Sequence, residues 1–434
     1  MEAEEKVIAR MKKRNMEIYS IHRMLTFDLL FYYAIKFLFL TQIKGFTAGN
    51  IVTASAFWGI FKVIFQIPVT TIIDKIGNRK SLIIADTLQA ISVIFIMMSV
   101  SLPMLIFANL FGAIAAAMKE VSESGILNLS IPEVENRSQI YSRIDGKALG
   151  NYYYISAVSA LLSGILFDVN GYIPMAICVI ILLISALISS KFQEIKENKE
   201  ENIKIQKRYK IYFKDLRLAF SFIFNSRRLK ALMLYSGIMY GMIMVMGTYE
   251  MGLLDEIGVS ATGTGLIYAI MQIIAGISSK KHNVFHEKYK NKSLTMIGIP
   301  YTLACLIAGI AAVSQMPHFI IVAIIVITYI IRYLDTGFYY VLIKKYITNF
   351  TNLEVSNKVY SAHGLVTGIG NFVICAFGAI VVSHNSIMNS MIIFGVIFSV
   401  IMILVLKYMS TRVGLNPKDY RKKDINYKEY IRLK

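Results

Sequence analysis

Charged side chains interrupt apolar stretches that are long enough to cross a membrane. A charge at the centre of a bilayer costs about 2.5–3.5 kcal/mol on insertion scales, so such residues are functional candidates by default. The alternative is that they form structural ion pairs between helices. The most central of them are Lys119, Glu120 and Glu123 in the run 104–130, and Arg332 and Asp335 in the run 317–345.

The spacing of these residues places a cation and an acid on one face of each helix. Lys119 precedes Glu123 by four residues and Arg332 precedes Asp335 by three, and both spacings bring side chains together on a helix. Lys119 and Arg332 each lie about 15 residues, or ~22 Å, from the outer end of their run. We therefore expect a central site near the bilayer midplane.

Other charges lie in the first two apolar runs. Asp28 and Lys36 fall in the run 24–43, and Lys62 falls at the middle of the run 48–73. The expected substrate and proton site comprises Asp28, Lys36, Lys62, Lys119, Glu120, Glu123, Arg332 and Asp335. A proton-coupled carrier needs a carboxyl group that changes its protonation state, and Glu120, Glu123 and Asp28 are the first candidates. Asp145 could neutralise a nearby cation, Glu250 is expected at a rim, and His363 is expected to be structural.

The elements that must position these charges are membrane helices. Of the 434 residues, 56% are hydrophobic and 17% are charged, against about 25% charged in a soluble domain. The net charge of +19 does not indicate nucleic-acid binding, because the basic residues lie in short loops and at the two ends. The three cysteines and six histidines show no metal or disulfide spacing, and no phosphate-binding loop is present. We expect no enzyme activity, no cofactor and no metal.

Twelve runs have the length of a membrane span, about 20 residues. They are 24–43, 48–73, 82–101, 104–130, 141–166, 172–190, 229–253, 259–279, 293–313, 317–345, 357–382 and 387–409. With the N-terminus placed inside, the outer loops hold one cation, Lys44, and the inner loops hold many, including Lys75, Lys80 and Lys280. This bias predicts cytosolic N- and C-termini.

The longest gap between spans divides the chain into six spans and six spans. We expect an N-terminal cytosolic segment, a first bundle, a cytosolic linker, a second bundle and a basic cytosolic tail, at 1–23, 24–190, 191–228, 229–409 and 410–434. Within the linker, residues 213–224 alternate charged and apolar side chains, which predicts an amphipathic helix at the membrane interface.

The two halves repeat short sequences six spans apart. Ile140-Tyr141-Ser142 opens the fifth span and Val359-Tyr360-Ser361 lies near the start of the eleventh. Each is followed by a small-residue ridge, Gly146 with Gly150 and Gly364 with Gly368, which allows helices to pack closely. The repeats predict two parallel six-helix bundles related by a pseudo-two-fold axis.

A loop between the second and third spans carries a specific pattern. It contains Asp74, Lys75, Gly77, Arg79 and Lys80. The pattern resembles the loop between helices 2 and 3 of the major facilitator superfamily, whose consensus is Gly-x-x-x-Asp-Arg/Lys-x-Gly-Arg-Arg/Lys. Thr70 replaces the first glycine and Asn78 the first arginine of the final pair. The resemblance implies a gating loop in which Asp74 meets the start of the eleventh span near Ser356, with Arg79 held by Glu123 or Asp145.

The resemblance covers roughly residues 20–410 and implies a secondary carrier that works by alternating access. We expect a monomeric, multi-pass protein of the plasma membrane whose partners are a small molecule, protons and the lipid bilayer. Proton-coupled efflux of an amphipathic compound is the first expectation, although the fifth span lacks the proline typical of export antiporters. Uptake of an anionic solute and a transport-dead membrane sensor are the alternatives.

Overall fold

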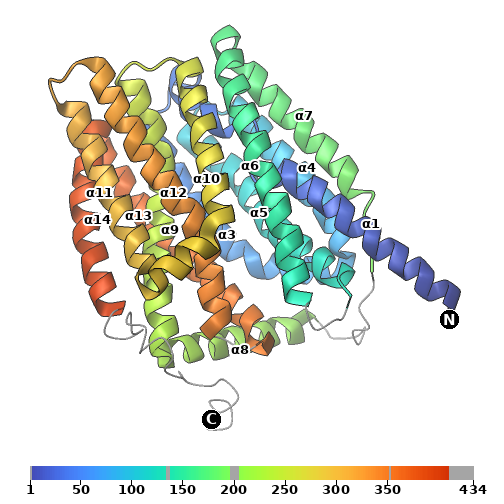
Figure 1. Cartoon of the computed structure of the whole chain (residues 1–434). Helices are drawn as coiled ribbons and strands as arrows, with labels where there is room; N and C mark the ends of the chain where they lie inside the picture. The colour runs from blue at the N-terminus through green and yellow to red at the C-terminus, as the bar shows by residue number, and fades with distance from the viewer. Residues whose placement is uncertain (1, 133–136, 196–204, 351–352, 410–434) are drawn as a thin grey trace. The chain divides into compact units, whose positions relative to one another are not determined.

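The structure is a computed structural model that describes residues 2–132, 137–195, 205–350 and 353–409. Throughout these ranges every regular element is a helix, so the all-α membrane fold is confirmed (Figure 1). Eleven of the described helices are long and apolar enough to cross a membrane. They are α3 (Ala48–Ile76), α4 (Asn78–Met98), α5 (Leu102–Ser130), α6 (Arg137–Val169), α7 (Tyr172–Ser189), α9 (Arg227–Glu256), α10 (Ala261–Tyr289), α11 (Ser293–Val313), α12 (His318–Phe350), α13 (Leu353–His384) and α14 (Ile387–Met409).

The first expected span, 24–43, is not one continuous helix. Helix α1 (Glu2–Thr26) ends within it, and turns follow over 27–32. Three short pieces complete the span, η1 (Tyr33–Ile35), α2 (Lys36–Leu38) and the π-helix η2 (Phe39–Ile43). Phe31 has a φ of 66°, a conformation outside the right-handed helix. The interruption could not be predicted from the sequence, because the segment is apolar throughout most of its length.

Contacts divide the chain into two compact units. Unit 1 contains Met1–Phe46, Phe61–Tyr209 and Ala261–Ala269, and unit 2 contains Thr47–Ile60, Lys210–Ser260 and Ile270–Lys434. The units differ from the expected bundles at 24–190 and 229–409 in two short segments: Thr47–Ile60 belongs to unit 2, and Ala261–Ala269 belongs to unit 1. The expected domain boundaries stay a prediction.

The same neighbour relations occur in both units. In unit 1, α4 packs against α5 and α7, and α1 packs against α6. In unit 2, α11 packs against α12 and α14, and α9 packs against α13. These pairs correspond when the chain is counted in two sets of six spans. The internal repeat seen in the sequence is therefore also a repeat of packing.

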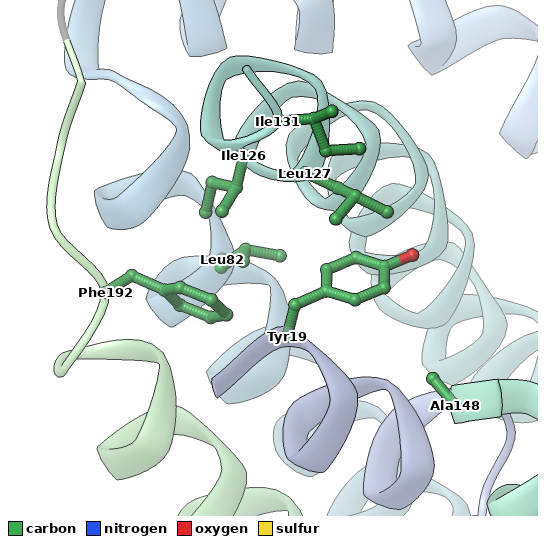
Figure 2. Close-up of a cluster of buried hydrophobic side chains, with 7 residues drawn as sticks. All are labelled: Tyr19, Leu82, Ile126, Leu127, Ile131, Ala148 and Phe192. Carbon is green, nitrogen blue, oxygen red and sulfur yellow. The ribbon is translucent and has the colours of Figure 1, made fainter. Parts of the chain in front are cut away.

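A hydrophobic cluster in unit 1 joins distant parts of the chain (Figure 2). Its buried members are Tyr19, Leu82, Ile126, Leu127, Ile131, Ala148 and Phe192. Beside it, the side-chain amide of Asn15 donates to the carbonyl of Gln193 at 2.9 Å, and its oxygen accepts from the Gln193 N–H at 2.8 Å. The N-terminal segment expected as a separate cytosolic piece is thus continuous with α1 and partly built into unit 1.

The amphipathic pattern at 213–224 forms a helix, α8 (Ile205–Asn225). Ala219, Phe222 and Ile223 are buried, while Phe213 and Phe224 are exposed. The apolar residues therefore divide between a packed face and an exposed face. An interfacial position for α8 stays a prediction, as do the expectations for the tail 410–434, which lies outside the described residues.

Candidate functional site

The interruption of the first span leaves backbone groups to be satisfied by side chains. The ammonium of Lys119 on α5 donates a hydrogen bond to the carbonyl of Thr26, the last residue of α1. The hydroxyl of Ser163 on α6 donates to the carbonyl of Phe31 at 3.0 Å. A cation is favourable at a helix C-terminus, where the backbone dipoles present partial negative charge. Lys119 therefore stabilises the break rather than pairing with Glu123 on its own helix.

Asp28 lies within the break and is half-buried. Its Oδ1 accepts a hydrogen bond from the N–H of Leu29 at 2.8 Å. The positive charges that act on it are those of Lys119 and Lys36, the latter at the start of α2. The structure thus brings together three of the expected site residues, Asp28, Lys36 and Lys119.

Aromatic rings surround the same interruption. The rings of Phe27 and Tyr152 lie 4.8 Å apart, and those of Tyr152 and Tyr153 lie 5.5 Å apart. The ring of Tyr33 lies 6.0 Å from that of Tyr268, which belongs to the part of α10 assigned to unit 1. Aromatic side chains offer apolar contact area beside polar groups. The break therefore combines charge with aromatic surface.

A second group of polar residues lies one turn before the break, and we call it the His22 cluster. Its members come from five helices: Tyr19, His22 and Arg23 (α1), Asp86 (α4), Glu123 (α5), Asp145 (α6) and Ser189 (α7). The imidazole Nε2 of His22 lies 2.9 Å from Asp86 Oδ2, and its Nδ1 lies 3.2 Å from Glu123 Oε1. His22, Asp86 and Glu123 are almost completely buried.

Arg23 and Asp145 complete this cluster. The guanidinium of Arg23 donates to Glu123 Oε2, and its Nε lies 3.4 Å from Asp145 Oδ1. The hydroxyl of Tyr19 donates to the same Asp145 oxygen at 2.7 Å. Glu123 and Asp145 are therefore held by Arg23, and not by Arg79 as the family resemblance implied.

Lys62 and Glu120 form an ion pair at the surface of unit 1. Lys62 Nζ lies 2.7 Å from Glu120 Oε2, and 59% of the Glu120 side chain is exposed. The Glu120 carboxylate therefore lies at the surface of unit 1, whereas Glu123 is buried inside it.

Unit 2 contains a buried ion pair that differs from the expected one. Arg332 Nη1 lies 2.7 Å from Glu250 Oε1, so the acid expected at a rim is inside the unit. The guanidinium carbon lies 4.6 Å from the centre of the Tyr329 ring. Asp335 is also buried, and its Oδ2 has no hydrogen-bond partner among the described residues. Arg332 and Asp335 are thus not paired to one another.

His363 belongs to a small polar group in unit 2. Its Nε2 lies 2.6 Å from the hydroxyl of Ser236, which lies 2.9 Å from the hydroxyl of Tyr339. Tyr339 also donates to the carbonyl of Ser236 at 2.9 Å. These contacts tie α9, α12 and α13 together, in agreement with a structural role for His363.

The loop between α3 and α4 is organised by an acid that the sequence did not single out. The N–H groups of Asn78 and Arg79, at the start of α4, donate to the two carboxylate oxygens of Glu194 at 2.9 and 2.8 Å. Gly77 has a φ of +85°, and a Cβ there would lie 2.7 Å from the Glu194 carboxyl carbon. The positive φ therefore favours glycine at position 77.

The remaining motif residues are at the surface. Asp74, Lys75 and Lys80 are exposed. The family resemblance implies that Asp74 meets the start of the eleventh span near Ser356 and Asn357. The side chains of these two residues lie outside the described part of the structure. A gating role for Asp74 stays a prediction.

Of the four glycines expected in packing ridges, the environment of Gly146 can be described, and Gly150, Gly364 and Gly368 stay a prediction. A Cβ on Gly146 would have no neighbour within 4 Å, which is not the environment of a packing ridge. A Cβ on Gly241 (α9) would lie 2.7 Å from the carbonyl of Gly370 (α13). In unit 1, a Cβ on Gly265 would lie 2.6 Å from the carbonyl of Ala160. Gly241 and Gly265 therefore allow their helices to pack closely against α13 and α6.

Four residues that the structure places in these sites were not predicted from the sequence. His22 and Arg23 lie in a charged segment that reads as solvated, and Glu194 lies in a polar linker. Of these four, only Asp86 could have been recognised from the sequence. It interrupts an apolar run, and a carboxylate buried in a membrane helix needs a partner. Among the described residues, no group could hold a metal ion.

The fold and the buried charges define a polytopic helical membrane protein of the transporter class. The family model of the Major Facilitator Superfamily matches residues 24–331, and the chain belongs to this family. Membership supports secondary transport of a small molecule as its activity. No curated protein sequence matches the chain.

Solved transporters share the fold at low sequence identity. The nucleoside transporter NupG (D323A mutant) matches with a TM-score of 0.65 and 15% identity, over 92% of this chain and 99% of that one. A D-xylose-proton symporter matches with a TM-score of 0.65 and 12% identity, over 92% and 97%. A POT family transporter in complex with 5-aminolevulinic acid matches with a TM-score of 0.64 and 12% identity, over 94% and 96%.

Proposed function

We propose that the protein is a proton-coupled secondary carrier that exports a small amphipathic molecule by alternating access. The observation that carries this proposal is the interrupted first span, with Asp28 inside the break and Lys119 on the carbonyl of Thr26. Carriers commonly build their midplane sites from interrupted membrane helices, because free backbone groups can then face a solute or an ion.

The chemistry around the break suits an amphipathic solute. The aromatic rings of Phe27, Tyr152 and Tyr33 supply apolar surface, while Asp28 supplies one acid. The cations of the expected site are engaged, since Lys62 contacts Glu120 and Arg332 contacts Glu250. This pairing leaves little free positive charge and favours the amphipathic compound over an anionic solute.

The proposed driving ion is the proton. Asp28 lies between lysines and accepts one backbone hydrogen bond, so its carboxyl group can exchange a proton without breaking an ion pair. Glu123 is fixed by Arg23 and His22, which makes it a poorer candidate for this role. The D-xylose-proton symporter among the similar folds uses protons by its printed name, which supports the choice by analogy.

We further propose a monomer in the plasma membrane with both termini on the cytosolic side. The support is the positive charge of the inner loops, which sets orientation. The end of unit 1 that carries Gly77 and Phe192 would then face the cytosol.

A reconstituted assay tests this function. The purified chain is placed in proteoliposomes containing a pH-sensitive dye, and ethidium, uridine, D-xylose and benzoate are offered in turn under an imposed pH gradient. We expect ethidium to move against its gradient with opposite movement of protons, and Asp28→Asn to abolish the coupled movement. Lys191→Ala, which removes an exposed charge beyond α7, is the matched control and should transport normally.

Each other outcome has a definite meaning. Selective movement of benzoate would replace the proposal by anion uptake, and movement of uridine or D-xylose would replace the amphipathic substrate by a neutral one. Failure of every probe, in protein that binds one of them in a direct assay, would favour a membrane sensor.

A further inference from the structure

We propose that His22 is a proton-binding site of this protein, which holds a proton between Asp86 and Glu123 and exchanges it with water on the side of Asp145. As a step in coupled transport, this inference rests on the proposed function. As a property of the folded chain, it rests on the geometry of the His22 cluster alone.

Both ring nitrogens of His22 face carboxylate oxygens. Nε2 lies 2.9 Å from Asp86, and Nδ1 lies 3.2 Å from Glu123. A neutral imidazole carries one N–H and one lone pair, so it can donate to only one of these acids. The protonated ring donates to both, and the arrangement is that of a bound proton.

The charges of the cluster balance only when His22 is protonated. The surrounding helices contribute two cations and three acids: Arg23 from α1, Lys119 and Glu123 from α5, Asp86 from α4 and Asp145 from α6. The phenols of Tyr19 and Tyr141 also border it and are uncharged at neutral pH. Without the proton on His22, one negative charge is left without compensation in a buried place, which is unfavourable.

Four further charged residues lie beyond these. The charges of Lys119 and Lys36 act on Asp28, and Lys62 forms an ion pair with Glu120. Asp28 and Lys36 carry opposite charges, as do Lys62 and Glu120, so these four residues leave the net charge unchanged while all of them are ionised.

Loss of the proton would change contacts as well as charge. If the proton leaves Nε2, the lone pair of that nitrogen faces Asp86 Oδ2, whose second hydrogen bond comes from Ser189 at 2.7 Å. Asp86 Oδ1 has no hydrogen-bond partner among the described residues, so Asp86 has no other stabilising contact to rely on. The contact between α1 and α4 would weaken, and α1 leads directly into the break at Thr26.

A route for exchange is present on one side of the cluster. The side chains of His22, Asp86 and Glu123 are at most 2% exposed, whereas those of Arg23 and Asp145 are 17% and 18% exposed. Asp145 is eight residues into α6, about 12 Å from its start at 1.5 Å per residue. Water therefore meets the cluster at Arg23 and Asp145, toward the end of the unit that carries Gly77.

The test follows the protonation of His22 directly in the full chain. Histidine-labelled protein in lipid nanodiscs is titrated by NMR, and the His22 signal is assigned among the six histidines by its loss in His22→Gln. We expect a doubly protonated ring at pH 7 that loses its proton reversibly at alkaline pH. In Glu123→Gln, one of the two acids is gone, and proton affinity should fall at least tenfold, or one pH unit.

The controls separate a proton site from a structural cation. Glu194→Gln removes a carboxylate from the same unit without touching the cluster and should leave the His22 titration unchanged. If Glu123→Gln does not fold, Asp86→Asn serves as the second variant with the same expectation. A neutral ring at pH 7, a ring that stays protonated up to pH 11, or an unchanged midpoint in the acid variants would each overturn the inference.

The outcome is independent of the transport assay. A titrating His22 in a protein that moves none of the probes would leave the proton site standing and remove the proposed function. A His22 that fails the titration in a protein that couples ethidium to protons would do the reverse.

Discussion

Arg332 on α12 and Glu250 on α9 form a buried ion pair, with 2.7 Å between Nη1 and Oε1. Nε and Nη2 of Arg332 and Oε2 of Glu250 have no hydrogen-bond partner among the described residues. Each charge therefore depends on the other, and the pair fixes α9 against α12 inside unit 2.

Removing one member of this pair should destabilise the protein strongly. Leaving a single charge in such a site costs about 3–5 kcal/mol. We expect Arg332→Met or Glu250→Gln alone to lower the yield of folded protein in size-exclusion chromatography. The double variant should recover it, because no uncompensated charge remains. A well-folded Arg332→Met single variant with normal transport would contradict the pairing.

The position of Arg332 along its membrane span could be predicted from the sequence, but its ion-pair partner could not. Helical periodicity relates residues three or four apart, so it linked Arg332 to Asp335 on the same helix. Glu250 lies on another helix, and no local pattern connects the two. The apolar spans and the internal repeat could be predicted from the sequence, with the interrupted first span as the exception. The gating role of the loop motif stays a prediction.

The cation at the end of α1 should be essential for transport. Lys119→Ala removes the donor to the Thr26 carbonyl and leaves the helix end without its positive charge. A hydrogen bond to a charged group contributes about 1.5–3 kcal/mol, enough to change the geometry of the break. We expect loss of ethidium transport in proteoliposomes with normal membrane expression.

The matching control for Lys119 is the conservative change Lys119→Arg. It keeps the charge and should retain part of the transport rate. Equal and full activity in both variants would show that the contact with Thr26 is dispensable.

Gly77 should tolerate no side chain. Gly77→Ala forces a φ of +85° on a residue with a Cβ and brings that atom against Glu194. A conformation of this kind costs about 1–3 kcal/mol. We expect a lower midpoint of thermal unfolding in detergent, and a smaller decrease for Glu194→Gln, which weakens the charge at the start of α4.

Gly146 supplies the control for that experiment. Its α6 environment is open, with nothing within 4 Å of a Cβ. Alanine is favoured over glycine by about 0.5–1 kcal/mol within a helix, so Gly146→Ala should raise the midpoint or leave it unchanged. If Gly146→Ala lowered the midpoint of thermal unfolding as much as Gly77→Ala, the effect at Gly77 would not be specific to its positive φ.

The orientation of the chain can be read from the two ends of α7. Val169 and Lys191 flank this helix, and both are exposed. The native cysteines Cys178, Cys305 and Cys375 are buried and should not react. We expect an impermeant maleimide to label Val169→Cys in intact cells and Lys191→Cys only after the membrane is opened. Labelling of Lys191→Cys from outside would reverse the proposed topology.

The paired hydrogen bonds between Asn15 and Gln193 bear on how the protein is synthesised. They join the first helix to the chain directly after α7, where Phe192 is buried and Glu194 binds the start of α4. All of these partners have left the ribosome before α10 is translated, and at ~5–20 residues per second the remaining chain takes roughly ten seconds or more to follow. We expect nascent chains that stop shortly after α9 to be already resistant to protease at this end.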